Sequence, residues 1–334
     1  MDSRSVLITG ISGQDGSYLA EEYLRAGYSV HGLVRRSSLT SRPRLDHLFN
    51  LNSSHREQKL KLHYADLNDL TALMRVISEI QPDLVVNLAA QSHVGVSFQV
   101  PIETTLVDGV GSLAIFEAVR IVNKEIRIYQ AGSSEMYGGM MGRKILDESS
   151  SFFPKSPYAA SKVFAHHVGK IYRDSYGMFI SNGILFNHES PRRGENFVSK
   201  KITRGAARIS MRKQSVLRLG NLESKRDWGH ARDYCQAIKK IMSHDKPDDF
   251  VVATGEMYTV TDFLELTFSS LGMDWRDFVE IDPELFRPNE VDDLRGDPSK
   301  IKRVLGWQPS VTFTELVREM LEFDLNELRG ARDN

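Results

Sequence analysis

A tyrosine and a lysine four residues apart are the first residues in this sequence whose types and spacing point to chemistry. Tyr158 and Lys162 belong to the stretch Ser-Pro-Tyr-Ala-Ala-Ser-Lys. On a helix this spacing places both side chains on one face, where the ammonium favours the phenolate and lowers the pKa of the phenol. Tyr158 is therefore a candidate general base near neutral pH. Because a chain with 11 tyrosines should hold about one such pair by chance, the functional interpretation depends on the motifs around it.

A serine and a glutamate form the second candidate group. Ser133 and Glu135 follow an apolar run over residues 126–129. If a strand continues through them, their side chains point to the same side. One hydroxyl and one carboxylate would then face the same substrate.

A glycine-rich turn near the N-terminus is expected to deliver a dinucleotide to these residues. The β-branched run over residues 5–9 is followed by Gly10, Gly13 and Gly16, and then by apolar residues at helical spacing. This order predicts a strand, a turn that lets a pyrophosphate approach the backbone, and a helix whose first amide groups bind it. The glycine spacing is looser than the Rossmann fingerprint, so a plain turn is the alternative.

The second predicted strand, residues 28–34, ends in Arg35, Arg36 and Ser37. An NAD enzyme places an acid about 20 residues beyond the glycines, where it holds a ribose hydroxyl. Two arginines suit a 2′-phosphate instead, which favours NADP. A solvated surface pair is the alternative.

Strands and helices continue to alternate along the chain. We predict strands over residues 59–64, 83–88, 178–186 and 250–253, and helices over 109–123, 260–271 and 312–328. The helix that carries Tyr158 and Lys162 is expected to continue to residue 176. This order predicts an α/β protein with a Rossmann-type doubly wound parallel sheet and a smaller, interleaved α/β substrate domain. We expect the NADP-binding domain to comprise residues 1–186 and 230–255, and the substrate domain to comprise 187–229 and 256–334.

Two loops after predicted strands carry further candidates. Asp66 is expected to cap the helix that follows it, and this role is compatible with an adenine contact. The small residues Ala89-Ala90-Gln91-Ser92 leave room for a ligand at the carboxyl edge of the sheet. His93, directly beyond them, is interpreted as structural.

Cations are dense between residues 192 and 232. In a nearly neutral protein this density favours a polyanionic ligand, of which a diphosphate is the obvious small example. A solvated cationic helix and turn is the alternative.

The composition argues against several classes of protein. Lys and Arg total 43 against 44 Asp and Glu, so the net charge of -1 offers no field for nucleic acid or an anionic membrane. The single cysteine, Cys235, excludes an internal disulfide and fits a reducing compartment. One cysteine cannot form the Cys/His cluster of a structural zinc site, and no carboxylate or cysteine lies at ligand spacing from His166 and His167. We therefore expect no metal. No apolar run approaches about 18 residues and no signal peptide is visible, so we expect a cytoplasmic protein.

Taken together, these motifs resemble the extended short-chain dehydrogenase/reductase superfamily and, more closely, the GDP-mannose 4,6-dehydratase family. The most specific stretches are Gly-Ile-Leu-Phe-Asn-His-Glu-Ser-Pro-Arg-Arg-Gly over residues 183–194 and Lys-Arg-Asp-Trp-Gly-His over 225–230. Further matches cover residues 9–16, 35–38, 88–93, 132–138, 156–162 and 286–297.

The resemblance implies three sets of site residues. The implied catalytic residues are Ser133, Glu135, Tyr158 and Lys162. The implied NADP contacts are Gly10, Gly13, Gln14, Asp15, Gly16, Arg36, Asp66, Leu67, Leu88, Ala89, Ala90, Gln91, Ser92, Tyr158, Lys162, His188 and Arg193, with Arg35 and Ser37 added by the strand-end argument above. The implied GDP-sugar pocket contains Ser92, Ser133, Glu135, Asn187, Lys201, Arg218, Arg226, Arg287 and Glu290.

The family's reaction would convert GDP-mannose to GDP-4-keto-6-deoxymannose through an internal NADP hydride cycle. Carbon 4 is oxidised, water is eliminated across carbons 5 and 6, and the hydride returns to carbon 6. The family usually has Thr where this chain has Ser133, so the hydroxyl is kept but loses a methyl group that restricts its rotamer. A lower rate or a different sugar is an open consequence.

Other activities stay open at this point. The same chemistry could act on a GDP-heptose or a GDP-N-acetylhexosamine, and a nucleotide-sugar 4-epimerase is a further alternative. Glu135 weighs against an epimerase, because epimerisation at carbon 4 needs no base at carbon 5. A non-catalytic NADP sensor is the most remote alternative, and a homodimer or homotetramer is the expected assembly.

Overall fold

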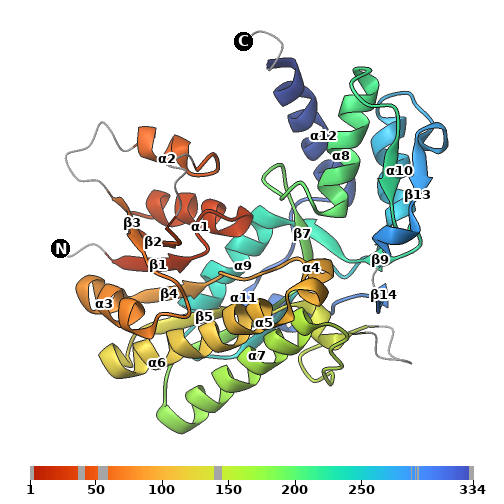
Figure 1. The fold of residues 1–334 in the computed structure, drawn as a ribbon. Coiled ribbons are helices and arrows are strands. Elements are labelled where there is room, and N and C mark those ends of the chain that lie inside the picture. Colours follow the sequence, from red (N-terminus) through yellow and green to blue (C-terminus); the bar gives the residue numbers. More distant parts are fainter. Residues whose placement is uncertain are drawn as a thin grey trace.

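A computed structural model provides the structure of the chain, with a parallel sheet at one end and a group of helices at the other (Figure 1). The residues that it describes are 4–36, 42–51, 59–138, 145–286, 288, 289, 291 and 293–330.

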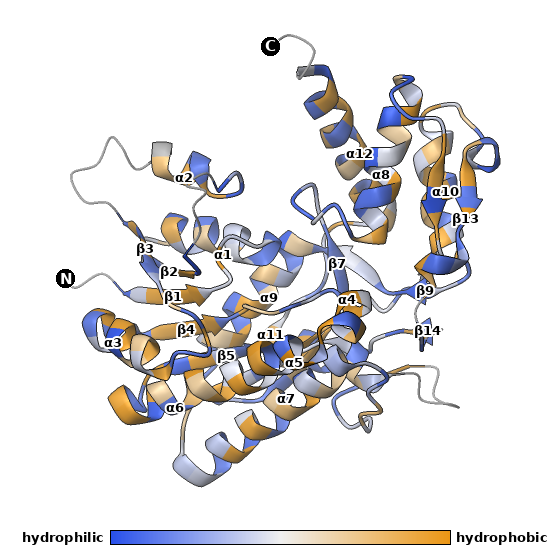
Figure 2. Ribbon diagram, viewed as in Figure 1, coloured by the Kyte–Doolittle hydropathy of each residue, from blue (hydrophilic) through white to orange (hydrophobic). Residues whose placement is uncertain are grey.

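Seven parallel strands form the main sheet, in the order β11-β6-β5-β4-β1-β2-β3. Their bounds are β1 Ser5–Thr9, β2 Ser29–Val34, β3 Leu60–Tyr64, β4 Leu84–Asn87, β5 Arg127–Ala131, β6 Ile180–Leu185 and β11 Asp249–Val252. The inner strands are apolar runs, as strands covered on both faces require, and Figure 2 shows β1 and β4 in hydrophobic colours. Strand order reverses between β1 and β4, which is where a doubly wound sheet binds its ligand. The predicted Rossmann-type sheet is confirmed.

Helices cover both faces of this sheet (Figure 1). On one face lie α1 (Gln14–Arg25), α9 (Ala231–Ser243) and α11 (Ser299–Leu305), whose apolar side chains join the core with Val6 and Ile8 of β1. On the other face lie α3 (Leu70–Ile80), α6 (Gly111–Asn123) and α7 (Pro157–Tyr176), packed on Leu7 and Val85.

The C-terminal third departs from the expected division at one place. Ile301 of α11 and Trp307 belong to the apolar core of the sheet, although residues 256–334 were expected to lie wholly in the substrate domain. The packing of α11 on β11 brings this segment back to the sheet.

A second group of helices has its own apolar core. The helices α8 (Val198–Ser210), α10 (Val260–Ser269) and α12 (Phe313–Gly330) pack around Ile202, Phe263 and Met320. Short strands border this group: β8 Leu217–Leu219 pairs with β13 Val279–Ile281, while β9 Lys225–Arg226 lies between β12 Tyr258–Thr259 and β14 Asp293–Leu294. Between the group and the sheet, β7 Asn187–Glu189 pairs with β10 Trp228–His230.

The remaining described elements are short. They are α2 Asp46–Leu51, α4 Val94–Gln99, α5 Pro101–Thr105, a π-helical turn Leu106–Val110 that leads into α6, and 3-10 turns at Ser134–Tyr137, Trp275–Asp277 and Pro283–Leu285. Among the residues described, no helix is both long and apolar enough to cross a membrane.

Two local predictions were wrong. The side chain of Asp69, not Asp66, caps α3 by accepting a hydrogen bond from the Ala72 amide at 2.9 Å. Asp66 instead accepts from the Asn68 amide at 3.0 Å, forming a turn before the helix. The strand β5 ends at Ala131, so Ser133 and Glu135 lie on the 3-10 turn that follows it rather than on a strand.

Candidate active site

The glycine turn between β1 and α1 has the geometry of an anion-binding loop. Gly10 has a φ of +67°, in the left-handed region that favours glycine. A Cβ at Gly16 would lie 2.4 Å from the Gly10 carbonyl oxygen, so only glycine lets α1 start this close to the turn. Gly13 caps α1 without a side-chain hydrogen bond, which leaves the first-turn amide groups to a ligand. These features fit the pyrophosphate of a dinucleotide.

A row of buried polar side chains holds the carboxyl ends of three strands in register. Thr9 of β1 donates to Asn87 of β4 at 2.6 Å, and Asn87 donates to Gln130 of β5 at 2.8 Å. The Thr9 hydroxyl oxygen also accepts from the amides of Leu88 and Ala89 at 3.1 Å. The loop after β4 is thereby fixed beside the glycine turn.

A cavity of about 1100 Å³ opens at this edge of the sheet and extends to the second group of helices. Single-ligand pockets are usually about 300–1,000 Å³, so the cavity has room for more than one small ligand. The residues predicted for the site that line it are Gly10, Gly13, Gln14, Asp15, Gly16, Arg35, Asp66, Leu67, Leu88, Ala89, Ala90, Gln91, Ser92, Ser133, Glu135, Tyr158, Lys162, Asn187, His188, Arg193, Lys201 and Arg226.

Five predicted residues are not placed in the cavity by the structure. Arg36 is exposed beyond the end of β2 and does not line the cavity, whereas its neighbour Arg35 does. Arg218 is exposed on β8 and pairs with Glu280 of β13 at 3.3 Å, because alternation along the short strand turns it outward. Ser37, Arg287 and Glu290 lie outside the described residues.

Tyr158 and Lys162 share one face of α7, as predicted. Ser156 caps this helix through its hydroxyl, which accepts from the Ala159 amide at 3.1 Å, and Pro157 occupies the first turn. The Lys162 ammonium is buried, donates to the Ala131 carbonyl at 3.0 Å and lies 5.8 Å from the centre of the Tyr158 ring. The lysine therefore anchors α7 to the end of β5.

The predicted lowering of the Tyr158 pKa was wrong for the protein without ligands. Burial raises the pKa of this phenol, and the Asp108 carboxylate raises it further, while a hydrogen bond with Ser133 opposes the shift. Burial also lowers the pKa of Lys162, with Asp108 opposing. A low local dielectric and a nearby carboxylate thus outweigh the ammonium on which the sequence argument relied.

Asp108 is a site residue that the sequence argument missed. It lies on the π-helical turn, is fully buried, and accepts from the Gln91 amide at 2.7 Å through one carboxylate oxygen. The other oxygen has no hydrogen-bond partner among the described residues. Burial raises the pKa of Asp108 to about 6, with Lys162 opposing. No local pattern marks it, because an aspartate in a helical stretch usually faces solvent.

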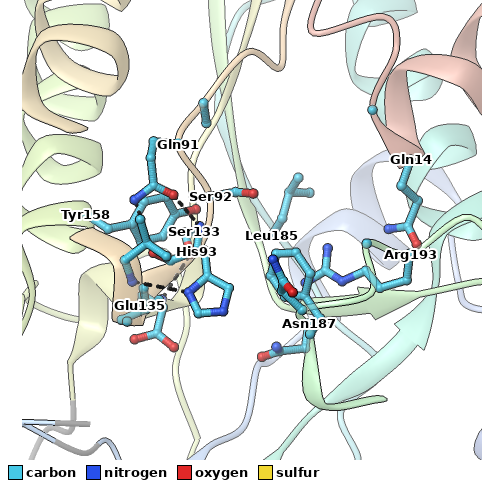
Figure 3. Close-up of a pocket in the computed structure, with 18 of the residues that line it drawn as sticks. Gln14, Gln91, Ser92, His93, Ser133, Glu135, Tyr158, Leu185, Asn187 and Arg193 are labelled. Carbon is cyan, nitrogen blue, oxygen red and sulfur yellow. Dashed lines mark hydrogen bonds between the residues drawn. The ribbon is translucent and has the colours of Figure 1, made fainter. Parts of the chain in front are cut away.

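Ser133 and Glu135 meet Tyr158 at the cavity wall. The Ser133 hydroxyl oxygen accepts from the Glu135 amide at 3.2 Å and so caps the 3-10 turn. Both side chains are buried except where they face the cavity. In Figure 3 they lie with Tyr158 on one side of the pocket, opposite Asn187 and Arg193. The 3-10 turn, rather than the predicted strand, thus brings the Ser133 hydroxyl and the Glu135 carboxylate to the Tyr158 phenol.

An ion pair joins the glycine-turn helix to β7. The two ring nitrogens of His188 lie 2.7 Å from the Asp15 carboxylate and 2.7 Å from the Phe186 carbonyl oxygen. Burial disfavours charge on His188, but Asp15 outweighs it and the pKa of His188 is raised. Burial likewise opposes the charge on Asp15, yet His188 holds the pKa of that carboxyl below its ordinary value. Two acceptors facing one ring require the imidazolium form.

Several of the dense cations between residues 192 and 232 are neutralised by carboxylates from distant parts of the chain, which leaves fewer of them for an anionic ligand. The pairs are Arg192 with Glu21, Lys200 with Asp324, Arg204 with Glu327, Arg218 with Glu280 and Arg232 with Glu319. The cations of this segment that line the cavity are Arg193, Lys201 and Arg226. Arg193 is itself paired, with its Nε 3.0 Å from Glu189.

His93 has a structural role, as interpreted, but it also lines the cavity. Its Nδ1 accepts from the Val96 amide at 3.2 Å and caps α4, so the proton of the neutral ring lies on Nε2. Its ring lies 5.5 Å from that of Phe197, over which the Arg193 guanidinium packs at 3.6 Å. His93 could have been found from its place directly after the small residues at the end of β4.

No group of three or more His, Cys, Asp or Glu side chains within the described ranges could hold a metal ion.

Comparisons with known proteins place the chain in a family and show the same fold in a solved structure. The family model described as GDP-mannose 4,6 dehydratase matches residues 7–320. The chain is 53% identical to GDP-mannose 4,6 dehydratase 2 of Arabidopsis thaliana, over 96% of this chain and 86% of that protein. It is 46% identical to GDP-mannose 4,6-dehydratase of Vibrio cholerae, over 99% and 96% of the two chains. A solved structure of UDP-glucose 4-epimerase from Thermus thermophilus, a complex with NAD, is similar in fold, with a TM-score of 0.80, 26% identity and coverage of 98% and 99%.

Proposed function

The chain belongs to the GDP-mannose 4,6-dehydratase family, and we propose that it converts GDP-mannose into GDP-4-keto-6-deoxymannose as an NADP-dependent hydro-lyase. The observation that carries this proposal is the meeting of Ser133, Glu135 and Tyr158 on one wall of a cavity that also contains the glycine turn. A phenol and a carboxylate at the same ring supply the two bases that oxidation at carbon 4 and loss of water across carbons 5 and 6 require.

The roles follow from the chemistry of each side chain. As a phenolate, Tyr158 would take the proton of the hydroxyl on carbon 4, and the positive charge of an oxidised nicotinamide would favour that form against burial and Asp108. Ser133, already hydrogen-bonded to the phenol, binds the same oxygen. The ketone acidifies carbon 5, whose proton Glu135 accepts and then donates to the departing hydroxyl of carbon 6. Ser134, which is buried in the same turn, offers no second carboxyl, so Glu135 acts as both base and acid. When bound, the nicotinamide supplies storage of a hydride between carbons 4 and 6.

The cofactor proposed is NADP. The glycine turn, the uncapped start of α1 and the Asp15–His188 pair line the cavity, and Arg35 lines it too. A guanidinium there suits a 2′-phosphate, which an acidic residue would repel. Relatives of the same fold bind different nicotinamide cofactors, since neighbours of similar fold were solved with NAD and with NADPH.

The substrate proposed is a GDP-sugar whose diphosphate lies near Lys201 and Arg226. These cations line the cavity from α8 and β9. The hydroxyl of Ser133 keeps the chemistry, while the missing methyl group leaves other GDP-sugars, such as a GDP-heptose or a GDP-N-acetylhexosamine, as the nearest alternative substrates. Glu135 argues against a simple 4-epimerase, which has no use for a base at carbon 5.

We further infer a division into two domains and an oligomeric assembly in the cytoplasm. The sheet with its helices would bind NADP, and the group of α8, α10 and α12 would bind the nucleotide sugar, with residues 297–309 returning to the sheet. Helices α5, α6 and α7 pack together and expose apolar side chains, among them Ile102, Ile121 and Ile171. A second copy of the chain is the partner that we propose for this face, because a homodimer covers it on both subunits.

The test is incubation of the protein with GDP-mannose and catalytic NADP, followed by mass spectrometry. We expect a product lighter by one water and no net oxidation or reduction of the cofactor. Turnover that consumes stoichiometric NADPH would contradict the internal hydride cycle, and a panel of GDP-sugars run in parallel identifies the preferred hexose.

A further inference from the structure

Asp227 separates two short strands that carry cavity residues. The strand β9 ends at Arg226 and β10 begins at Trp228, and both of these side chains line the cavity. Asp227 lies between them and is fully buried outside the cavity. Alternation along an extended chain therefore directs Arg226 and Trp228 to the ligand side and Asp227 to the opposite side.

The carboxylate of Asp227 binds two other segments of the chain. One oxygen accepts from the amide and the hydroxyl of Thr254, at 2.8 and 2.7 Å. The other accepts from the amides of Gly255 at 2.8 Å and Gly296 at 3.4 Å. Thr254 and Gly255 follow β11 of the main sheet, whereas Gly296 follows β14 of the second group. One side chain thus joins three stretches that pass between the two halves of the molecule.

A fourth stretch that passes between the two halves, the segment leading into β7, packs against Gly296. A Cβ at Gly296 would lie 2.3 Å from the Ala253 Cβ and 2.8 Å from a ring atom of Phe186, the residue directly before β7. In addition, the Asp227 amide donates to the Leu294 carbonyl at 3.2 Å. The backbone around Asp227 therefore has little room to move without losing hydrogen bonds.

We propose that Asp227 is a positioning residue for the nucleotide-sugar site: by holding this junction together, it fixes the direction in which Arg226 points toward the diphosphate. The inference rests on the proposed function, because it assigns Arg226 to a GDP-sugar. Asp227 itself does not touch the ligand. Its carboxylate acts through the strand, whose Arg226 pairs in register with Leu294 of β14 and whose Trp228 pairs with Asn187 of β7.

The Asp227→Asn variant tests this role with little change in volume. In the unaltered protein, each carboxylate oxygen of Asp227 accepts from at least one backbone N–H. Whichever way the asparagine amide is oriented, its NH2 group faces one of these N–H groups, so the junction must shift. We expect GDP, titrated calorimetrically into protein saturated with NADP, to bind about tenfold more weakly. The affinity for NADP should change less than twofold, because the glycine turn is not attached to Asp227.

Asp233→Asn is the matched control. Asp233 is also a buried carboxylate with three donors, namely the amide and hydroxyl of Ser310 at 2.8 and 2.6 Å and the Val311 amide at 3.0 Å. Neither Asp233 nor its partners line the cavity. This variant should keep its GDP affinity, whatever thermal stability it loses. Equal GDP affinities for the two variants would overturn the proposal, since Asp227 would then be merely structural.

A double variant tests whether Asp227 acts through Arg226. Arg226→Gln should weaken GDP binding, and Asp227→Asn in that background should weaken it less than twofold further. If the two substitutions weaken GDP binding independently, so that their fold-losses multiply, the proposal that Asp227 acts through Arg226 would be overturned. If Asp227→Asn does not fold, Thr254→Val removes one of the four hydrogen bonds and should weaken GDP binding about fivefold; unchanged binding would overturn the proposal. Failure of the unaltered protein to bind GDP would overturn the proposed function as well, whereas normal GDP binding by Asp227→Asn overturns this inference alone.

Discussion

The imidazole of His188 and the carboxylate of Asp15 lie 2.7 Å apart and join β7 to the first turn of α1. The second ring nitrogen of His188 faces the Phe186 carbonyl, and the ring stacks on Tyr234 with centroids 4.6 Å apart. This contact connects the glycine turn to the segment that leads into the second group of helices. Because both ring nitrogens of His188 face acceptors, the geometry requires a protonated imidazole in this ion pair.

His188→Phe should therefore destabilise the protein in a pH-dependent way. The variant keeps the ring stack but leaves Asp15 buried without its partner, at a cost of about 3 kcal/mol in the free energy of unfolding. Because the folded pKa of His188 is raised, its contribution is complete below the unfolded value of 6.5 and is lost as the pH rises through the folded pKa. Because the pKa of Asp15 is lowered, its contribution is present above 3.8 and disappears as the pH falls through the folded value.

Urea unfolding of both proteins between pH 5 and pH 9 measures this effect. We expect the difference between the unaltered protein and His188→Phe to shrink toward alkaline pH. His166→Phe is the control, since burial lowers the pKa of His166 to about 4 and its contribution should stay constant above pH 7. A constant difference for His188 would contradict the ion pair.

The Tyr158 phenol should remain protonated in the ligand-free protein well above neutral pH. Burial and the Asp108 carboxylate both raise its pKa. The tyrosinate absorbance of Tyr158 is the difference between pH titrations of the unaltered protein and of Tyr158→Phe. This difference should consequently appear only above pH 10. In Asp108→Asn the same absorbance should appear at lower pH, because one of the two causes is removed. A Tyr158-dependent step near pH 7 would instead support the phenolate predicted from the Tyr-x-x-x-Lys spacing.

Glu135→Gln should separate oxidation from dehydration. Tyr158 and Ser133 stay in place, so carbon 4 is still oxidised, but no carboxylate removes the proton from carbon 5. With GDP-mannose and NADP, the absorbance of reduced cofactor should rise to a plateau equal to the number of sites, while product formation falls at least 100-fold. Tyr158→Phe is the paired control and should show no reduction. Full turnover by Glu135→Gln would remove this residue from the mechanism.

Arg35→Ala should weaken NADP much more than NAD. Arg35 lines the cavity beyond the glycine turn, and a charge-assisted hydrogen bond to a 2′-phosphate is worth about 1.5–3 kcal/mol, or about 10- to 150-fold in affinity. Arg36→Ala, a change at the neighbour that does not line the cavity, should have a smaller effect of the same kind. Fluorescence titration with both cofactors checks this, and equal losses for NAD and NADP would refute the cofactor proposal.

Ile171→Glu should shift the protein toward monomers if the face of α5, α6 and α7 is covered by a second copy. Ile171 is 55% exposed on α7, so a carboxylate there is harmless in a monomer but would be desolvated in a dimer. Size-exclusion chromatography with light scattering gives the molar mass directly. Val304→Glu, at an exposed apolar position on α11, is the control, and an unchanged mass for both variants would contradict the proposed interface.

The order of strands and helices could be predicted because each depends on neighbouring residues. The run over residues 5–9, the glycines after it and the apolar spacing beyond it predict β1, the turn and α1 without reference to the rest of the chain. Tyr158 and Lys162 share a helical face for the same local reason. Most of the predicted site residues then meet in one cavity, since a parallel sheet brings the carboxyl ends of its strands to one edge.

Local patterns therefore specify which side chains stand at the ends of which elements. Tertiary structure alone decided their surroundings. Arg192 pairs with Glu21 and Lys200 pairs with Asp324, so cations of this segment are neutralised by carboxylates more than 100 positions away. Tyr158 meets Asp108 from another helical turn, and its pKa rises where spacing predicted a fall. A pKa or an ion pair depends on burial and on charges brought close by folding, which a local pattern does not contain.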